Sequence, residues 1–109
     1  MDRIDLAHAL SRFDDHWSPK IIAALNGQEV KLAKFQGAFD WHSHADEDEL
    51  FLVLDGSFRM DFRDRTVELQ EGQMIVVPRG VEIDCARFPR VGRTVRGLQG
   101  LRANIGARC

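Results

Sequence analysis

The sequence contains no tyrosine and only two cysteines among its 109 residues. A small secreted domain usually depends on several disulfides, and neither Cys85 nor Cys109 lies in a C-x-x-C metal or redox pair. The longest apolar run, residues 50–54, is far shorter than the roughly 18–20 residues that a membrane span requires. The first residues carry acids where a signal peptide carries bases. We therefore expect a cytoplasmic protein with no membrane partner.

The chain is long enough for one domain, and 44% of its residues are apolar, which is sufficient for one core. A domain of this size buries only about two-thirds of its unfolded surface, so association with a second copy would add stability. The run 50–54 is apolar at both strand parities, which indicates a strand that is covered on both faces. We therefore expect a homodimer.

Acidic residues are absent from the last part of the chain. Residues 1–84 hold all 17 acids and nine bases, a net charge of −8, whereas residues 85–109 hold six arginines and no acid, a net charge of +6. This arginine- and glycine-rich composition predicts an irregular basic tail, with short edge strands that complete a barrel as the alternative. A nucleic-acid-binding arm is disfavoured because only Phe88 interleaves with the arginines.

The hydrophobic pattern predicts an all-β domain behind one short helix. Residues 3–13 have apolar side chains near helical spacing. Residues 29–35 alternate polar and apolar, which predicts a strand with one wet face and one dry face. The other expected strands, separated by turn signals such as Asn26-Gly27 and Asp55-Gly56, are 20–25, 39–44, 49–54, 57–63, 66–69 and 73–77. The expected organisation is an N-terminal helix and lead-in over 1–19, an antiparallel sandwich or barrel over 20–84, and the tail over 85–109.

One segment carries the residue types of a metal site. His42 and His44 are two apart, so on a strand both imidazoles point to the same face. Glu49 follows at the head of the next strand, and a reversal at 45–48 would return its carboxylate to the pair. Two imidazoles and one carboxylate suit a divalent transition metal such as Fe, Mn, Zn or Ni. We predict His42, His44 and Glu49 as ligands, although H-x-H also occurs on surface strands and Glu47 lies within reach.

The glycines, proline and histidines around this segment follow two known motifs. Gly37 precedes His42 by four residues, and His44 is followed by four residues, Glu49, six residues and Gly56. In the second motif Gly72 is followed by five residues, Pro78-Arg79-Gly80, two residues and a position that the family fills with histidine but that is here Ile83. Over residues 20–82 the chain resembles the cupin superfamily, in particular its small single-domain, phosphomannose-isomerase-like members.

This resemblance implies a small jelly-roll barrel with a metal in its mouth, ligated by His42, His44 and Glu49, and turns at Gly56, Gly72 and Gly80. It also implies a small-molecule ligand. The function is then that of a metal-dependent enzyme or, alternatively, of a non-catalytic binding or sensing domain. Ile83 removes the fourth ligand of the family and leaves open a remnant that binds nothing. We assign no catalytic residue, because tyrosine is absent and the other histidines, His8 and His16, lie near the N-terminus.

Three features change within a few residues: acids end at Asp84, the second-motif histidine is replaced by Ile83, and arginine and glycine become frequent. A reading-frame change in the gene just before Ile83 would produce all three. We expect sequencing of the locus to reveal this change. An uninterrupted frame that close relatives share through Cys109 would reject the hypothesis.

Overall fold

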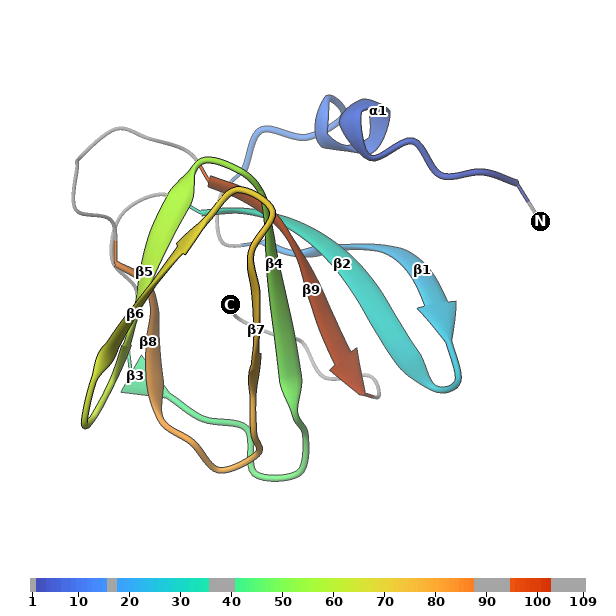
Figure 1. Cartoon of the computed structure of the whole chain (residues 1–109). Coiled ribbons are helices and arrows are strands. Elements are labelled where there is room, and N and C mark those ends of the chain that lie inside the picture. Colours follow the sequence, from blue (N-terminus) through green and yellow to red (C-terminus); the bar gives the residue numbers. More distant parts are fainter. Residues whose placement is uncertain (1, 16–17, 36–40, 88–94, 103–109) are drawn as a thin grey trace.

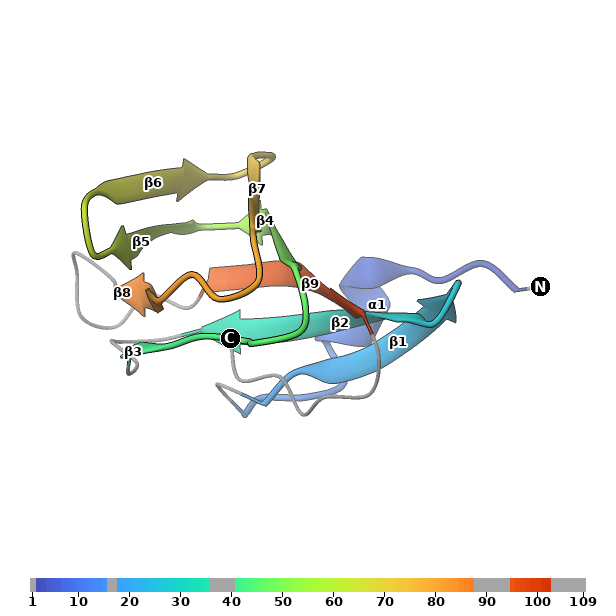
Figure 2. The ribbon, with the colours of Figure 1, turned by 90° about the horizontal axis from the view of Figure 1, so that it is seen from below.

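The computed structural model describes residues 2–15, 18–35, 41–87 and 95–102, which form two antiparallel β-sheets and one short helix. The sheets face each other as two layers (Figures 1 and 2). The all-β jelly-roll that we predicted is therefore confirmed. In chain order the elements are α1 (Leu6–Leu10), β1 (Lys20–Leu25), β2 (Gln28–Phe35), β3 (Trp41–His42), β4 (Glu49–Asp55), β5 (Ser57–Phe62), β6 (Thr66–Gln70), β7 (Met74–Val77), β8 (Ile83–Arg87) and β9 (Val95–Arg102).

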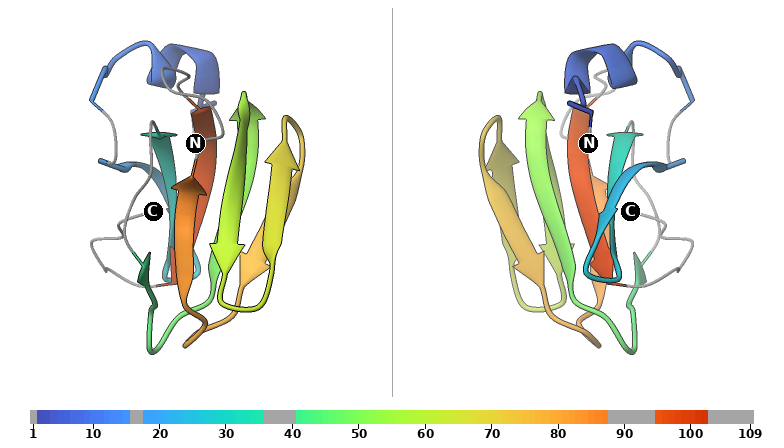
Figure 3. Two further views of the ribbon diagram at one scale, coloured as in Figure 1. Left: turned by 90° about the vertical axis from the view of Figure 1, so that its left-hand side faces the viewer. Right: turned by 90° about the vertical axis from the view of Figure 1, so that its right-hand side faces the viewer.

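The larger sheet has the strand order β1-β2-β9-β4-β7, and the smaller sheet has the order β3-β8-β5-β6. Every pairing is antiparallel. Figure 3 shows α1 at one end of the sandwich and the loop between β3 and β4 at the other. Among the described residues no helix is long and apolar enough to cross a membrane.

The turn residues adopt the conformations that their types predict. Asn26 and Gly27, between β1 and β2, have φ angles of 51° and 74°. Positive φ at both central residues characterises a two-residue type I′ hairpin turn, which asparagine and glycine favour. The glycines predicted at the other turns, Gly56, Gly72 and Gly80, also have positive φ angles.

Residues 95–102 differ from the prediction. They form β9, the central strand of the larger sheet, rather than part of an irregular tail. The strand pairs with β2 from Gln28↔Arg102 to Phe35↔Val95, and its other edge pairs with β4. Pairing on both edges satisfies the backbone groups of this glycine-containing segment, and such tertiary context overrides a weak strand propensity. The rest of the predicted tail, apart from β8, lies outside the described residues.

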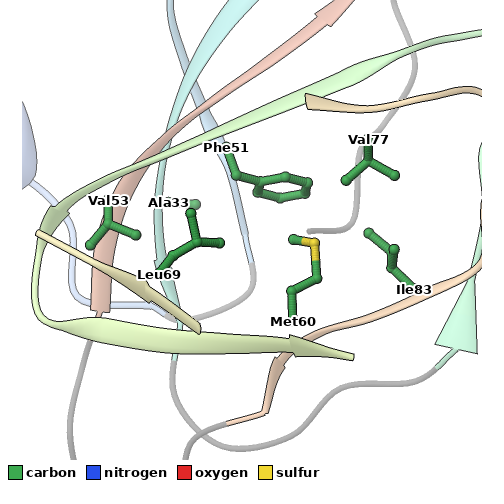
Figure 4. Close-up of a cluster of buried hydrophobic side chains, with 7 residues drawn as sticks. All are labelled: Ala33, Phe51, Val53, Met60, Leu69, Val77 and Ile83. Carbon is green, nitrogen blue, oxygen red and sulfur yellow. The ribbon is translucent and has the colours of Figure 1, made fainter. Parts of the chain in front are cut away.

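The core lies between the two sheets and takes one face of each strand. Along β4, Glu49, Phe51 and Val53 are buried, whereas Leu50, Leu52 and Leu54 on the opposite face are partly buried. This period of two is the one that the sequence predicts for the strand. The buried apolar residues that pack together are Ala33, Phe51, Val53, Met60, Leu69, Val77 and Ile83 (Figure 4).

The N-terminal segment covers the outer face of β2. Asp5 caps α1 by accepting a hydrogen bond from the backbone N–H of His8 at 3.1 Å. Lys34 is only 8% exposed, and its ammonium donates to the carbonyl oxygens of Leu10, at 2.8 Å, and of Phe13. It also lies 4.5 Å from the centre of the Phe13 ring, within range of a cation–π interaction. The predicted wet face of β2 is therefore wrong, because the N-terminal segment covers it.

Two methionines provide a matched test of the core. Met60 is fully buried, whereas Met74 on edge strand β7 is 60% exposed. We expect Met60→Ala to lower the free energy of unfolding by about 2–5 kcal/mol, because it leaves a cavity. Met74→Ala should change it by less than about 0.5 kcal/mol. Urea unfolding followed by circular dichroism measures both values, and equal effects of the two variants would contradict the assigned core.

Candidate metal centre

Two loops meet at the end of the sandwich farthest from α1 (Figure 1). One loop joins β3 to β4 and carries His44 and Glu47, and the other joins β7 to β8. The N–H of Gly80 donates to the carbonyl oxygen of His44 at 2.7 Å, and the N–H of Arg79 donates to Asp48 Oδ1 at 2.9 Å. Gly80 has a φ of 79°, which glycine adopts without steric penalty. The second motif therefore positions the loop that contains the first motif.

His44 and Glu49, two of the three predicted ligands, are in contact. His44 Nε2 lies 3.0 Å from Glu49 Oε2, and their side chains are 16% and 2% exposed. Hydrogen bonding to Glu49 raises the pKa of His44 above its ordinary value, and burial opposes this shift. The five-residue spacing of these two residues predicts this approach, since the loop reverses the chain between them.

Glu47 is a second buried carboxylate at the same end. It is 5% exposed, and among the described groups its Oε2 atom has no hydrogen-bond partner. Its charge helps to raise the pKa of His44. Burial of an ionised carboxylate is unfavourable unless a donor or a cation compensates it. The local chemistry therefore fits a cation, as the donor set of His44 and Glu49 does.

His42, the third predicted ligand, is described only by its backbone. In β3 it pairs with Ile83, and its neighbour Trp41 pairs with Asp84. Its side chain lies outside the described residues, so its role as a ligand stays a prediction. Among the side chains that the structure describes, no group of three His, Cys, Asp or Glu residues is placed to hold a metal ion.

Ile83 occupies the position where the second motif has a histidine. Its side chain is 1% exposed and belongs to the core cluster, in which it lies near Met60 and Val77 (Figure 4). The site thus has an apolar wall in place of a fourth nitrogen donor, as the sequence predicts.

Sequence analysis missed Lys31. This residue is only 3% exposed, and its ammonium lies 3.6 Å from Glu29 Oε1. Lys31 shares the inner face of β2 with Ala33, and its charge opposes the rise in the pKa of His44. The available signal was ambiguous because β2 has apolar residues at both parities, and we took Leu32 to be on the inner face.

The comparison with protein families agrees with this arrangement of fold and motifs. The family described as "Cupin domain" matches residues 25–84, which is more than half of the chain. The chain belongs to the cupin family. The small single-domain cupin that we predicted is confirmed, whereas the phosphomannose-isomerase-like subgroup stays a prediction.

Individual cupins and related structures extend this result. The "Uncharacterized protein YdbB" of Bacillus subtilis (strain 168) is 43% identical over 60 residues, or 54% of this chain, and the chain spans about half (53%) of its length. A cupin-2 domain containing protein from Shewanella frigidimarina superposes with a TM-score of 0.83 and 37% identity, covering 93% of this chain and 94% of that protein. Protein NMB1881 from Neisseria meningitidis gives a TM-score of 0.80 and 26% identity, with coverages of 94% and 100%. These relatives support the fold over nearly the whole chain.

The raised pKa of His44 predicts how the metal-free protein responds to pH. A raised folded-state pKa means that the folded protein binds the proton more tightly, so this stabilisation is complete below the ordinary value of 6.5. It is lost as the pH rises through the raised pKa. In a chelator, the difference in unfolding free energy between wild type and His44→Gln should shrink across this range. Urea unfolding at several pH values measures it, with His8→Gln on α1 as an exposed control. A difference that grows with pH would contradict the assigned pair.

Proposed function

We propose that this cupin binds a divalent transition metal through His42, His44 and Glu49, and a small-molecule ligand beside it. The observation that carries the proposal is the buried contact of His44 with Glu49 at the end where the two motif loops meet. An imidazole nitrogen and a carboxylate oxygen suit Fe, Mn, Zn or Ni alike. A metal held there would act as a Lewis acid toward an oxygen atom of the ligand.

The surrounding residues have distinct roles in this proposal. Glu49 neutralises part of the charge of the ion, and the Gly80 N–H holds the backbone of His44 in place. Ile83 contributes no donor, so three protein ligands leave coordination positions for water or for the ligand. Glu47 is the candidate proton acceptor, because it is buried and its Oε2 atom has no hydrogen-bond partner among the described groups.

Two functions fit this site. A metal-dependent enzyme would use Glu47 to accept a proton from the ligand, whereas a non-catalytic binding or sensing cupin would hold the ligand unchanged. The absence of the second-motif histidine at Ile83 favours neither function. Product formation or oxygen uptake with small acids and sugars distinguishes the enzyme from the binder.

A homodimer and a cytoplasmic location remain parts of the proposal. Met74 and Val76 on edge strand β7 are 60% and 50% exposed, and they pair with Leu52 and Leu50 of β4. This apolar outer face is consistent with a second copy covering β4 and β7.

Elemental analysis tests the metal site. We expect protein prepared without added metal or an affinity tag to contain a transition metal, and His44→Ala to lose most of it while keeping its circular dichroism spectrum. His8→Ala removes an exposed histidine of α1 and should retain the metal. Bound metal that is unchanged in His44→Ala would show that the site is wrongly assigned.

A further inference from the structure

Strand β2 buries two lysines on opposite faces, and only one of them has an evident structural role. The ammonium of Lys34, on the outer face, holds the N-terminal segment through the carbonyls of Leu10 and Phe13. Lys31 points into the sandwich, where it is 3% exposed and lies beside an acid, Glu29. A buried ion pair is often no more stabilising than apolar residues of similar volume. Packing alone therefore does not explain a lysine at position 31.

The strand register places Lys31 across the interior from the candidate metal centre. Glu29 of β2 and Glu49 of β4 both pair with Leu101 of the intervening strand β9. The backbones of β2 and β4 are thus two strand spacings apart, about 10 Å. Lys31 is the next residue on the same face of β2, and its charge acts on His44. This separation leaves room for a small molecule between the lysine and the His44–Glu49 pair.

The charges around Lys31 indicate what such a molecule carries. The Lys31 ammonium is the cationic group of an interior that also contains the carboxylates of Glu29, Glu47 and Glu49. The 3.6 Å contact with Glu29 is longer than the roughly 2.7–2.9 Å of a charge-assisted hydrogen bond, so a closer carboxylate can replace it. A singly charged carboxylate is repelled less by the three acids than a doubly charged phosphate is.

We propose that Lys31 binds the carboxylate of a small organic acid whose other end lies at the His44–Glu49 pair. This inference rests on the proposed function for the position of the second end, and it names the ligand class as small carboxylic acids. Lys31 is then a specificity-determining residue, because it distinguishes an acid from its neutral amide.

Ligand binding by variants of the two buried lysines tests the proposal. Isothermal titration with acetate, pyruvate and benzoate, each beside its amide and beside inorganic phosphate, gives the dissociation constants. We expect wild type to prefer at least one carboxylate over its amide and over phosphate. Lys31→Met should bind that carboxylate at least about tenfold more weakly, because a charge-assisted hydrogen bond is lost. Lys34→Met, which removes the other buried lysine of β2, should bind it as wild type does.

Glu29→Gln provides a second readout that does not require Lys31→Met to fold. Removing the competing carboxylate should strengthen carboxylate binding severalfold if Lys31 is the anchor, whereas a purely structural ion pair predicts no gain. Unchanged or weaker binding by this variant overturns the proposal.

The metal content of each sample separates this inference from the proposed function. If metal is bound but Lys31→Met binds the carboxylate as wild type does, the inference fails and the metal site stands. If no metal is bound and carboxylate binding still depends on Lys31, the metal site fails and the inference stands. Equal binding of the acids and their amides by wild type, or no binding of either, overturns the inference in both cases.

Discussion

The pleat of β4 is the constraint on which both the core and the candidate site depend. Because successive side chains of a strand alternate between its faces, Glu49 shares the interior with Phe51 and Val53. A one-residue shift in the pairing of β4 would turn Glu49 out of the site and also remove Phe51 from the core. The hydrophobic stability of the sandwich therefore maintains the position of the site carboxylate. Selection for a packed core and selection for this carboxylate act on the same strand register.

Local patterns predicted the features of the fold that depend on neighbouring residues. The Asn26-Gly27 turn follows from residue types that tolerate positive φ, and the buried face of β4 follows from its period of two. The faces of β2 were not predictable in this way, because Lys31 and Lys34 are buried by segments distant in sequence. The position of β9 likewise depends on two distant partner strands, and its own composition is a poor guide to that position.

The same distinction applies to the candidate site. The approach of Glu49 to His44 followed from a short reversal between them, and the loss of a donor at Ile83 followed from motif spacing. The burial of Glu47 depends on how the two motif loops pack, which the spacing of residues does not reveal. Membership of the cupin family establishes the fold, whereas the acids and the lysine inside the sandwich are the basis for its proposed chemistry.

The position of β9 also affects the order in which the protein can fold. The β1–β2 hairpin joins the larger sheet only through β9, which lies between β2 and β4. A ribosome must therefore synthesise the chain through Arg102 before residues 20–35 gain their partner on that edge. Contacts so far apart in sequence slow folding, and the unpaired edge of β2 stays available to other chains in the meantime. During synthesis this hairpin is the part of the molecule most in need of protection from aggregation.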